Sequence, residues 1–374
     1  MYKRHVLQSE ALRLARLLTD PGASEDRIRP EYPAARPNYS AAKAQKMLNF
    51  SPERSVWMGL AQCIQAIVVQ MRDAGDLPSN QQELPPLLDA IESRSGVLAG
   101  QTCVVADATS EIGRALCVLL SRCGADVIAI GSDTASGQDL MQELDVRPSC
   151  KSGTFYHATM LNMSNLRTVA NAILKSNVRI DALFHCASAY FEAPNLTEEG
   201  IDETFALNHL SAFQIIEALR PAISKQGHIV MCSSRLHSGS GLDFSDLFCR
   251  QNYDPVDAFA RAKFANLMFS QALFERCEQD GPNIVAINHG LDPFPRSTAR
   301  GAHAGFSQER NVPQTISALN AASRIANVLV DPSFAGRNGI YIDEDRESLT
   351  DPNVRHSASC ERLWAVSEAL VEIT

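Results

Sequence analysis

Two acidic residues stand in a turn where a phosphate could otherwise bind. The segment "VVADATSEIGRALCVLLSRCGADVIAI" (104–130) runs from an apolar strand pattern through a turn into a helix pattern. Amides at a helix N-terminus attract anions, but one carboxylate about 4 Å from a phosphate charge costs roughly 4 kcal/mol at an effective dielectric of about 20. A micromolar ligand is held by only about 8 kcal/mol. Asp107 and Glu111 therefore predict that this turn binds no phosphate.

Two alternatives to that prediction remain for the acidic turn. Both side chains could turn outward and leave an anion undisturbed. Alternatively, a carboxylate could lie on the helix N-terminus itself and replace the phosphate as the favoured negative group.

Histidine and cysteine are the other residue types here that could bind a metal or take part in a reaction. His185 and His289 follow apolar runs, so we expect both at the carboxyl ends of strands, but no Cys/His/Asp group at ligand spacing accompanies them and we predict no metal site. The 10 cysteines form no CxxC pair, and several lie inside apolar runs. This usage favours a reducing compartment and buried thiols.

Short β-branched runs alternate with helix patterns from about residue 98 and must position these side chains. The runs are "TCVVA", "DVIAI", "TFYHATM", "DALFHCA", "GHIVMCSS", "NIVAINH" and "NGIYID". Such alternation predicts an α/β fold with a doubly wound parallel sheet, covered by helices on both faces. We assign this domain to residues 96–374.

Residues 1–95 have a different pattern and predict a helical N-terminal extension. Helix patterns near 6–19, 41–50, 55–73 and 84–93 are separated by proline-bearing linkers, of which 27–40 is the clearest. The apolar run 56–71 contains three Gln and is too short to span a bilayer comfortably. The formal charge of −9 and the absence of a basic block argue against direct nucleic-acid binding. We expect a cytoplasmic or nuclear protein, with a mitochondrial presequence as the alternative.

The domain resembles the short-chain dehydrogenase/reductase family. "IDALFHCASAY", "LTEEGIDETFALNHLSAF", "GHIVMCSSRLHSGSGLDFSDL", "DAFARAKFANLMFSQALFERC" and "LWAVSEALVE" follow the order and spacing of the family. Within it they are most similar to the retinol dehydrogenases and to the oxidoreductase region of WW-domain-containing oxidoreductase. The resemblance implies a Rossmann-like fold, an NAD or NADP cofactor and a TGxxxGxG loop. Its three glycine positions fall on Asp107, Glu111 and Gly113, and only the last is kept.

The resemblance also implies four active-site positions. Asn208 matches the asparagine that orders a water relay, Ser234 the serine that holds the substrate oxygen, and Lys263 the lysine that binds the nicotinamide ribose and lowers the tyrosine pKa. Phe259 stands where the tyrosine should be, and it cannot transfer a proton. Loss of general acid–base catalysis costs on the order of 10²–10⁴ in rate. Tyr253, in the preceding loop, is a poor substitute.

Further family landmarks on the nucleotide cleft also differ. The NNAG segment is "HCAS" (185–188), the acidic residue after the third strand is Asn162, and PG is "HG" (289–290). We therefore predict a catalytically inactive protein without cofactor or metal, in which Asn208, Ser234 and Lys263 are kept for packing. The alternative is an NAD(P)-dependent oxidoreductase on a lipophilic alcohol or carbonyl, such as a steroid or retinoid, with a non-standard proton donor.

If the protein is catalytically inactive, we expect it to have a protein-binding, scaffold or regulatory role. We expect protein partners to bind through the N-terminal helices 1–95. Related proteins dimerise through the helices that carry the asparagine and the lysine, so we also expect a homodimer through 202–220 and 257–277.

Overall fold

The computed structural model describes residues 96–145, 153–238, 240–251, 253–277, 281–291 and 314–372. All of them belong to one unit of the chain, Ala90–Thr374. The predicted helical extension 1–95 and the apolar run 56–71 lie outside the described residues, so the division at 95/96 stays a prediction. Among the helices of the described segments, none is both long and apolar enough to cross a membrane.

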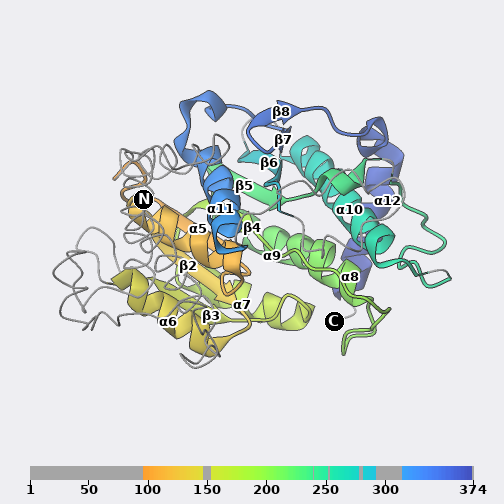
Figure 1. Ribbon diagram of the computed structural model, residues 1–374, viewed down its shortest axis with the longest axis horizontal. Coiled ribbons are helices and arrows are strands. Elements are labelled where there is room, and N and C mark those ends of the chain that lie inside the picture. Colours follow the sequence, from red (N-terminus) through yellow and green to blue (C-terminus); the bar gives the residue numbers. More distant parts are fainter. Residues whose placement is uncertain are drawn as a thin grey trace, which may run out of the picture. The chain divides into compact units, whose positions relative to one another are not determined.

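The domain is organised around one eight-stranded sheet with the order β3-β2-β1-β4-β5-β6-β7-β8 (Figure 1). Seven strands are parallel, and the short β8 pairs antiparallel with β7. The strands are β1 (Thr102–Ala106), β2 (Asp126–Gly131), β3 (Thr154–His157), β4 (Ile180–His185), β5 (Ile223–Cys232), β6 (Asn283–Asn288), β7 (Ile340–Asp343) and β8 (Arg346–Ser348). The predicted doubly wound parallel sheet is confirmed, with each of the seven apolar runs in a strand.

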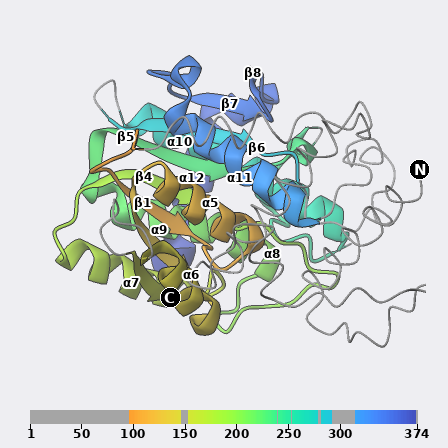
Figure 2. The same ribbon diagram turned by 60° about the vertical axis from the view of Figure 1, so that its left-hand side comes forward.

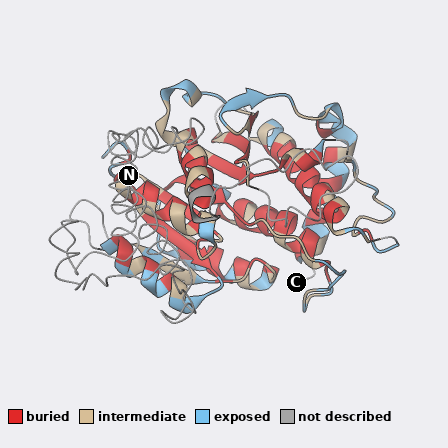
Figure 3. Ribbon diagram, viewed as in Figure 1, coloured by how far each residue is buried: buried red, intermediate tan, exposed pale blue. Residues whose placement is uncertain are grey.

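Helices cover both faces of this sheet, as Figures 1 and 2 show from two sides. On one face lie α5 (Glu111–Arg122), α6 (Thr134–Asp145) and α11 (Gln314–Val330). On the other lie α7 (Met163–Lys175), α8 (Glu203–Phe205), α9 (Ser211–Leu219) and α10 (Pro255–Arg276), with α12 (Ser357–Glu372) against α10. Buried residues gather on the strands and on the helix faces toward them (Figure 3). Because strand side chains alternate in direction, β4 sends Leu183 into one core and Phe184 into the other.

The helix α10 carries two of the expected site positions and is buried around most of its circumference. Asp254 caps it by accepting hydrogen bonds from the amides of Val256 and Asp257, both at 2.9 Å. Buried residues then continue along nearly its whole length because α12 covers the side that faces away from the sheet. This long, enclosed helix holds the floor of the candidate site in a fixed position.

The C-terminal helix α12 packs against the apolar faces of α9 and α10. The Trp364 ring lies 5.1 Å from that of Phe213 and 5.6 Å from that of Phe269, and His209 bonds Ser367 at 2.9 Å. A homodimer through 202–220 and 257–277 stays a prediction, and it would have to use surface that α12 leaves uncovered or to displace that helix.

Candidate functional site

The loop between β1 and α5 keeps the backbone form of a phosphate loop. Asp107 has a φ of 69°, a left-handed conformation that glycine adopts freely and that aspartate tolerates better than most residues. A Cβ on Gly113 would lie 2.1 Å from the Asp107 carbonyl oxygen, so only glycine fits there. Ser110 caps α5 by accepting a hydrogen bond from the Gly113 amide at 3.2 Å. The remaining glycine is thus required by the close packing of the loop itself.

The two acidic side chains of this loop have different surroundings. Asp107 is half-buried, and burial raises the pKa of its carboxyl to about 6, although a hydrogen bond from Ser110 and the charge of Lys263 act in the opposite direction. Glu111 is exposed and is the first residue of α5, where a negative charge is favoured by the helix dipole. The electrostatic argument against a bound phosphate therefore rests on Asp107, and the prediction that both acids oppose a phosphate stays a prediction for Glu111.

Lys263 lies beside the carboxyl ends of β4 and β5. Its Nζ donates hydrogen bonds to the backbone oxygens of Ala187 at 3.0 Å and Cys232 at 3.3 Å. The side chain is fully buried, at 0% exposure. Because the two carbonyls follow neighbouring strands, the ammonium ties the two strand ends together.

Phe259 lies one helical turn before Lys263 and is also fully buried. Its ring centroid is 5.4 Å from the Lys263 Nζ, a cation–π distance. The ring belongs to an apolar cluster with Leu236, Val256 and Ala260. Phe259, at the position of the family's tyrosine, is thus part of the hydrophobic core and lies beside the buried ammonium of Lys263.

Ser234 and Asn208 are both engaged with backbone groups. The Ser234 hydroxyl caps a short 3₁₀ helix by accepting from the Leu236 amide at 3.2 Å, and its carbonyl bonds His237 Nδ1 at 2.6 Å. Asn208 lies in a π-helical turn, Ala206–Leu210, between α8 and α9. Its amide group pairs with Ala189 in both directions, at 2.6 and 3.2 Å. These bonds hold the loops after β4 and β5, whatever further role the two side chains have.

The backbone carbonyl of Asn208 accepts a hydrogen bond from Asn266 Nδ2 at 2.6 Å. A π turn leaves a carbonyl without its usual helical partner, and Asn266 of α10 supplies one. Asn266 lay outside the sequence prediction because the family motifs that we compared do not include it. Its position on α10, three residues after Lys263, is the only signal in the sequence that could have found it.

The hydroxyl of Tyr253 is held outside the Lys263 environment. It donates to the Phe191 carbonyl at 2.7 Å and pairs with the Thr204 hydroxyl at 3.0 Å. Burial raises the pKa of Tyr253, whereas a catalytic phenol is tuned in the opposite direction.

Three further residues that differ from the family pattern, Asn162, His185 and His289, have local structural roles. Asn162 caps α7 by accepting from the Asn165 amide at 2.7 Å. His185 Nε2 bonds the Ser211 hydroxyl at 2.7 Å, and burial lowers the pKa of this histidine to about 3, so its imidazole is neutral. His289 Nδ1 accepts from the Leu291 amide at 3.3 Å. Within the part of the chain that the structure describes, no three His, Cys, Asp or Glu side chains are grouped as metal ligands.

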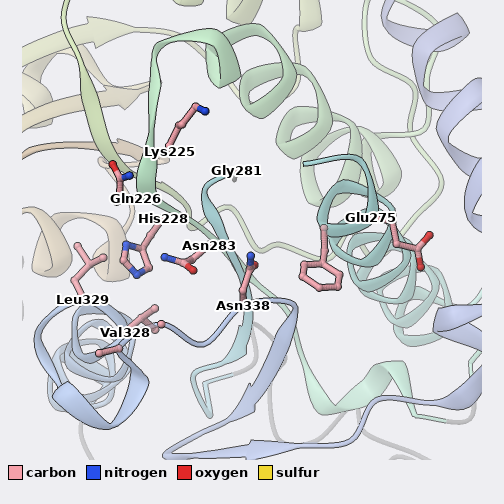
Figure 4. Close-up of a pocket in the computed structure, with 12 residues that line it drawn as sticks. Lys225, Gln226, His228, Glu275, Gly281, Asn283, Val328, Leu329 and Asn338 are labelled. Carbon is pink, nitrogen blue, oxygen red and sulfur yellow. The ribbon is translucent and has the colours of Figure 1, made fainter. Parts of the chain in front are cut away.

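A cavity of about 1080 Å³ lies elsewhere, near the amino ends of β5 and β6 (Figure 4). The strand partners His228 and Asn283 line it together with Val328 and Leu329 from the end of α11. Parallel strands have all their carboxyl ends at one edge of the sheet, so this cavity is separate from the Lys263 side chain at the carboxyl ends of β4 and β5. It contains none of the residues that the sequence singled out.

Comparison with known proteins agrees with this geometry. The family model described as short chain dehydrogenase matches residues 101–291. The chain belongs to the short-chain dehydrogenase family. Mouse retinol dehydrogenase 14 is 28% identical over 298 residues, covering 74% of this chain and 88% of that relative. Human WW domain-containing oxidoreductase is 26% identical over 311 residues, covering 79% and 74%.

Two solved structures show the same fold as this family member. One, from Mycobacterium paratuberculosis, has a TM-score of 0.59 at 21% identity and covers 74% of this chain and 94% of its own. The other is a short chain dehydrogenase from Burkholderia cenocepacia in complex with NADP, with a TM-score of 0.52 at 21% identity, covering 66% and 97%. At these identities the similarity establishes the fold alone. The chemistry of this chain has to be argued from its own residues.

Proposed function

We propose that this short-chain dehydrogenase family member performs no hydride transfer and acts as a protein-binding, scaffold or regulatory subunit. The observation that carries the proposal is the fully buried Phe259 beside Lys263. A carbonyl or alcohol substrate needs a group that exchanges a proton as hydride moves. The phenyl ring offers none, and the Tyr253 hydroxyl is engaged with Phe191 and Thr204.

The phosphate loop supports the proposal through Asp107. The residues present do not fit a dinucleotide diphosphate, because the carboxyl of Asp107 stands where the family has a glycine without a side chain. One charge at about 4 Å would cost roughly 4 kcal/mol at an effective dielectric of about 20, half of the roughly 8 kcal/mol of micromolar binding. Glu111 is exposed and is not needed for this argument. We propose that the chain binds neither NAD nor NADP.

Titration calorimetry and thermal shift with NADH and NADPH test the proposal directly. We expect no binding heat and no shift in melting temperature for the full chain. Micromolar binding of either nucleotide would refute the loss of the cofactor. The control is Glu111→Gly, which removes an exposed acid from the same loop and should leave the result unchanged.

A converse experiment asks whether the cleft is otherwise intact. The double variant Asp107→Gly/Phe259→Tyr restores the two family residues whose loss carries the proposal. We expect it to gain measurable dinucleotide binding, since the loop backbone already has the left-handed turn at 107 and the close approach at Gly113. The triple variant that adds Glu111→Gly should bind no more tightly than the double variant.

The second candidate is an NAD(P)-dependent oxidoreductase acting on a lipophilic alcohol or carbonyl of steroid or retinoid type. The family match and the similarity to proteins named as retinol dehydrogenases favour it. Asn208, Ser234 and Lys263 are the residues that would serve it, with a proton donor other than a tyrosine at 259. Turnover of all-trans-retinol with NADP⁺, followed by absorbance at 340 nm, separates the two candidates, and Lys263→Met is the matched variant that should abolish it.

Protein partners are proposed to bind through residues 1–95, in the cytoplasm or the nucleus. Affinity purification with the full chain and with a chain lacking 1–95 tests this directly, and partners lost on deletion support it. Light scattering of the full chain tests the proposed homodimer. A monomer would be consistent with α12 occupying the apolar faces of α9 and α10.

A further inference from the structure

Two cysteines face each other across neighbouring strands, at the carboxyl ends of β4 and β5. Cys232 is the last residue of β5, and Cys186 follows the last residue of β4. The strands are parallel and His185 pairs with Met231, so the next pair in register is Cys186 with Cys232. β4 and β5 lie side by side in the centre of the sheet (Figure 1). Strands about 4.8 Å apart place such a pair within the Cα separation of about 4.4–6.8 Å that a disulfide needs.

Both thiols also point to the same face of the sheet. They belong to the apolar cluster between the sheet and the helices α5 and α11, whereas Met231 lies in the opposite cluster. Cys186 is 2% and Cys232 1% exposed, and both are free thiols. The side chains therefore meet without any movement of the backbone between strands.

Lys263 and His289 favour a negative charge on Cys232, whereas the neighbouring Asp107 carboxyl opposes it. Lys263 Nζ donates to the Cys232 carbonyl at 3.3 Å. His289 directly follows the neighbouring strand β6, in which Ile287 pairs with Cys232. The Cys186 hydrogen bond, His289 and Lys263 all lower the pKa of Cys232, against the effect of burial. The same hydrogen bond, together with burial, raises the pKa of Cys186. One thiol is thus set up as the nucleophile and the other as its proton-bearing neighbour.

Other buried cysteines in the same cluster lack this arrangement. Cys103 lies inside β1 and Cys117 inside α5, and burial raises the pKa of both thiols. Both provide internal references because they share the apolar cluster and the buried state. Cys103 has no neighbouring cation that lowers its pKa, whereas Arg114 acts to lower the pKa of Cys117 without outweighing burial.

We propose that Cys232 and Cys186 form a peroxide-sensitive thiol pair at the carboxyl ends of β4 and β5. The Cys232 thiolate attacks one oxygen of hydrogen peroxide, the O–O bond breaks, and hydroxide leaves and takes a proton to become water. The resulting sulfenic acid condenses with the Cys186 thiol, which forms the S–S bond and releases a second water. Each disulfide consumes one peroxide and two thiols. The proposal does not depend on the proposed loss of oxidoreductase activity.

The disulfide would join the ends of the two strands whose carbonyls hold Lys263. A small oxidant suits the site because peroxide is close to water in size, whereas a bulky alkylating reagent would not reach thiols so deeply buried. In the folded chain we therefore expect peroxide to oxidise Cys232 under conditions in which N-ethylmaleimide leaves it unmodified.

Peptide mapping of the full chain by mass spectrometry tests the proposal. The reduced protein is treated with hydrogen peroxide, unfolded and alkylated, and we expect one linked pair of peptides containing Cys186 and Cys232. Cys186→Ser should leave Cys232 as a sulfenic acid that dimedone labels when it is present during unfolding, and Cys232→Ser should leave Cys186 reduced. Cys117→Ser is the matched control and should still form the pair.

Two results would overturn the proposal. One is oxidation of Cys232 no faster than that of Cys103 and Cys117 in the wild-type chain, a measurement that needs no variant to fold. The other is a peroxide-induced disulfide that links either cysteine to a different partner.

Discussion

Replacing Asp107 by asparagine should stabilise the protein at neutral pH and leave it unchanged in acid. Asparagine has nearly the same shape and also tolerates the left-handed backbone at φ 69°, but it cannot ionise. The pKa of the Asp107 carboxyl is raised from 3.8 to about 6, chiefly by burial. A shift of this size corresponds to ~3 kcal/mol, since each pKa unit is about 1.4 kcal/mol.

The sign of the effect follows from proton binding. Between pH 3.8 and about 6 the unfolded chain has released the Asp107 proton while the folded chain retains it. Stability therefore falls as the pH rises through this window, and the full cost is reached above the folded pKa. The asparagine variant escapes that cost, so its advantage should be near zero below about pH 4 and grow to ~3 kcal/mol above pH 7.

Paired urea denaturation of the wild type and Asp107→Asn from pH 4 to pH 8 measures this difference, because all other titrating groups cancel. Glu111→Gln is the control: it should lose about 0.3–1 kcal/mol of helix-dipole attraction, a change of the opposite sign. A variant Asp107→Asn that is less stable than the wild type at pH 7.5 would refute the reasoning. It would show that attraction between Asp107 and Lys263 outweighs the desolvation of the carboxylate.

Three further outcomes are expected from stability measurements. Trp364→Ala should cost ~3–5 kcal/mol in urea denaturation, because the ring fills the contact of α12 with Phe213 and Phe269; an exposed change such as Glu372→Ala is the control. His209→Gln should reduce the loss of stability on acidification below pH 6.5, because burial lowers the pKa of His209 to about 4 and the unfolded state binds the proton first. Phe259→Tyr alone should destabilise by ~1–3 kcal/mol, since it places a hydroxyl in an apolar cluster, and a gain in stability would indicate a bond to Lys263 or to another polar group.

Much of the fold could be predicted from local patterns. Each of the seven runs contributes a strand to the sheet. The central strands are apolar and rich in β-branched residues because they are buried on both faces, whereas the edge strand β3 is only partly buried. The eighth strand, β8, escaped prediction because its three residues are all exposed and have no apolar pattern. The first residues of α7 and α10 were not predicted from the sequence. The structure shows that Asn162 and Asp254 cap these two helices.

Less of the candidate site could be predicted. Spacing alone placed Lys263 and Phe259 one helical turn apart on a single helix. It did not separate Asp107 from Glu111, because the direction of a side chain in a turn depends on the backbone angles there and on what packs above it. The partner of the Asn208 carbonyl came from a different helix, and the pairing of Cys186 with Cys232 depends on strand register.

The sequence by itself determined a doubly wound α/β fold, because that follows from local periodicity along the chain, and its resemblance to the short-chain dehydrogenase family assigned residue types to the chemical positions. Only the tertiary structure decided that one of the two loop acids is half-buried and the other exposed, that α12 covers the faces of α9 and α10, and that two thiols lie on the neighbouring ends of β4 and β5. These outcomes depend on contacts between segments far apart in the chain, where burial and register set the charge and the reactivity of each group.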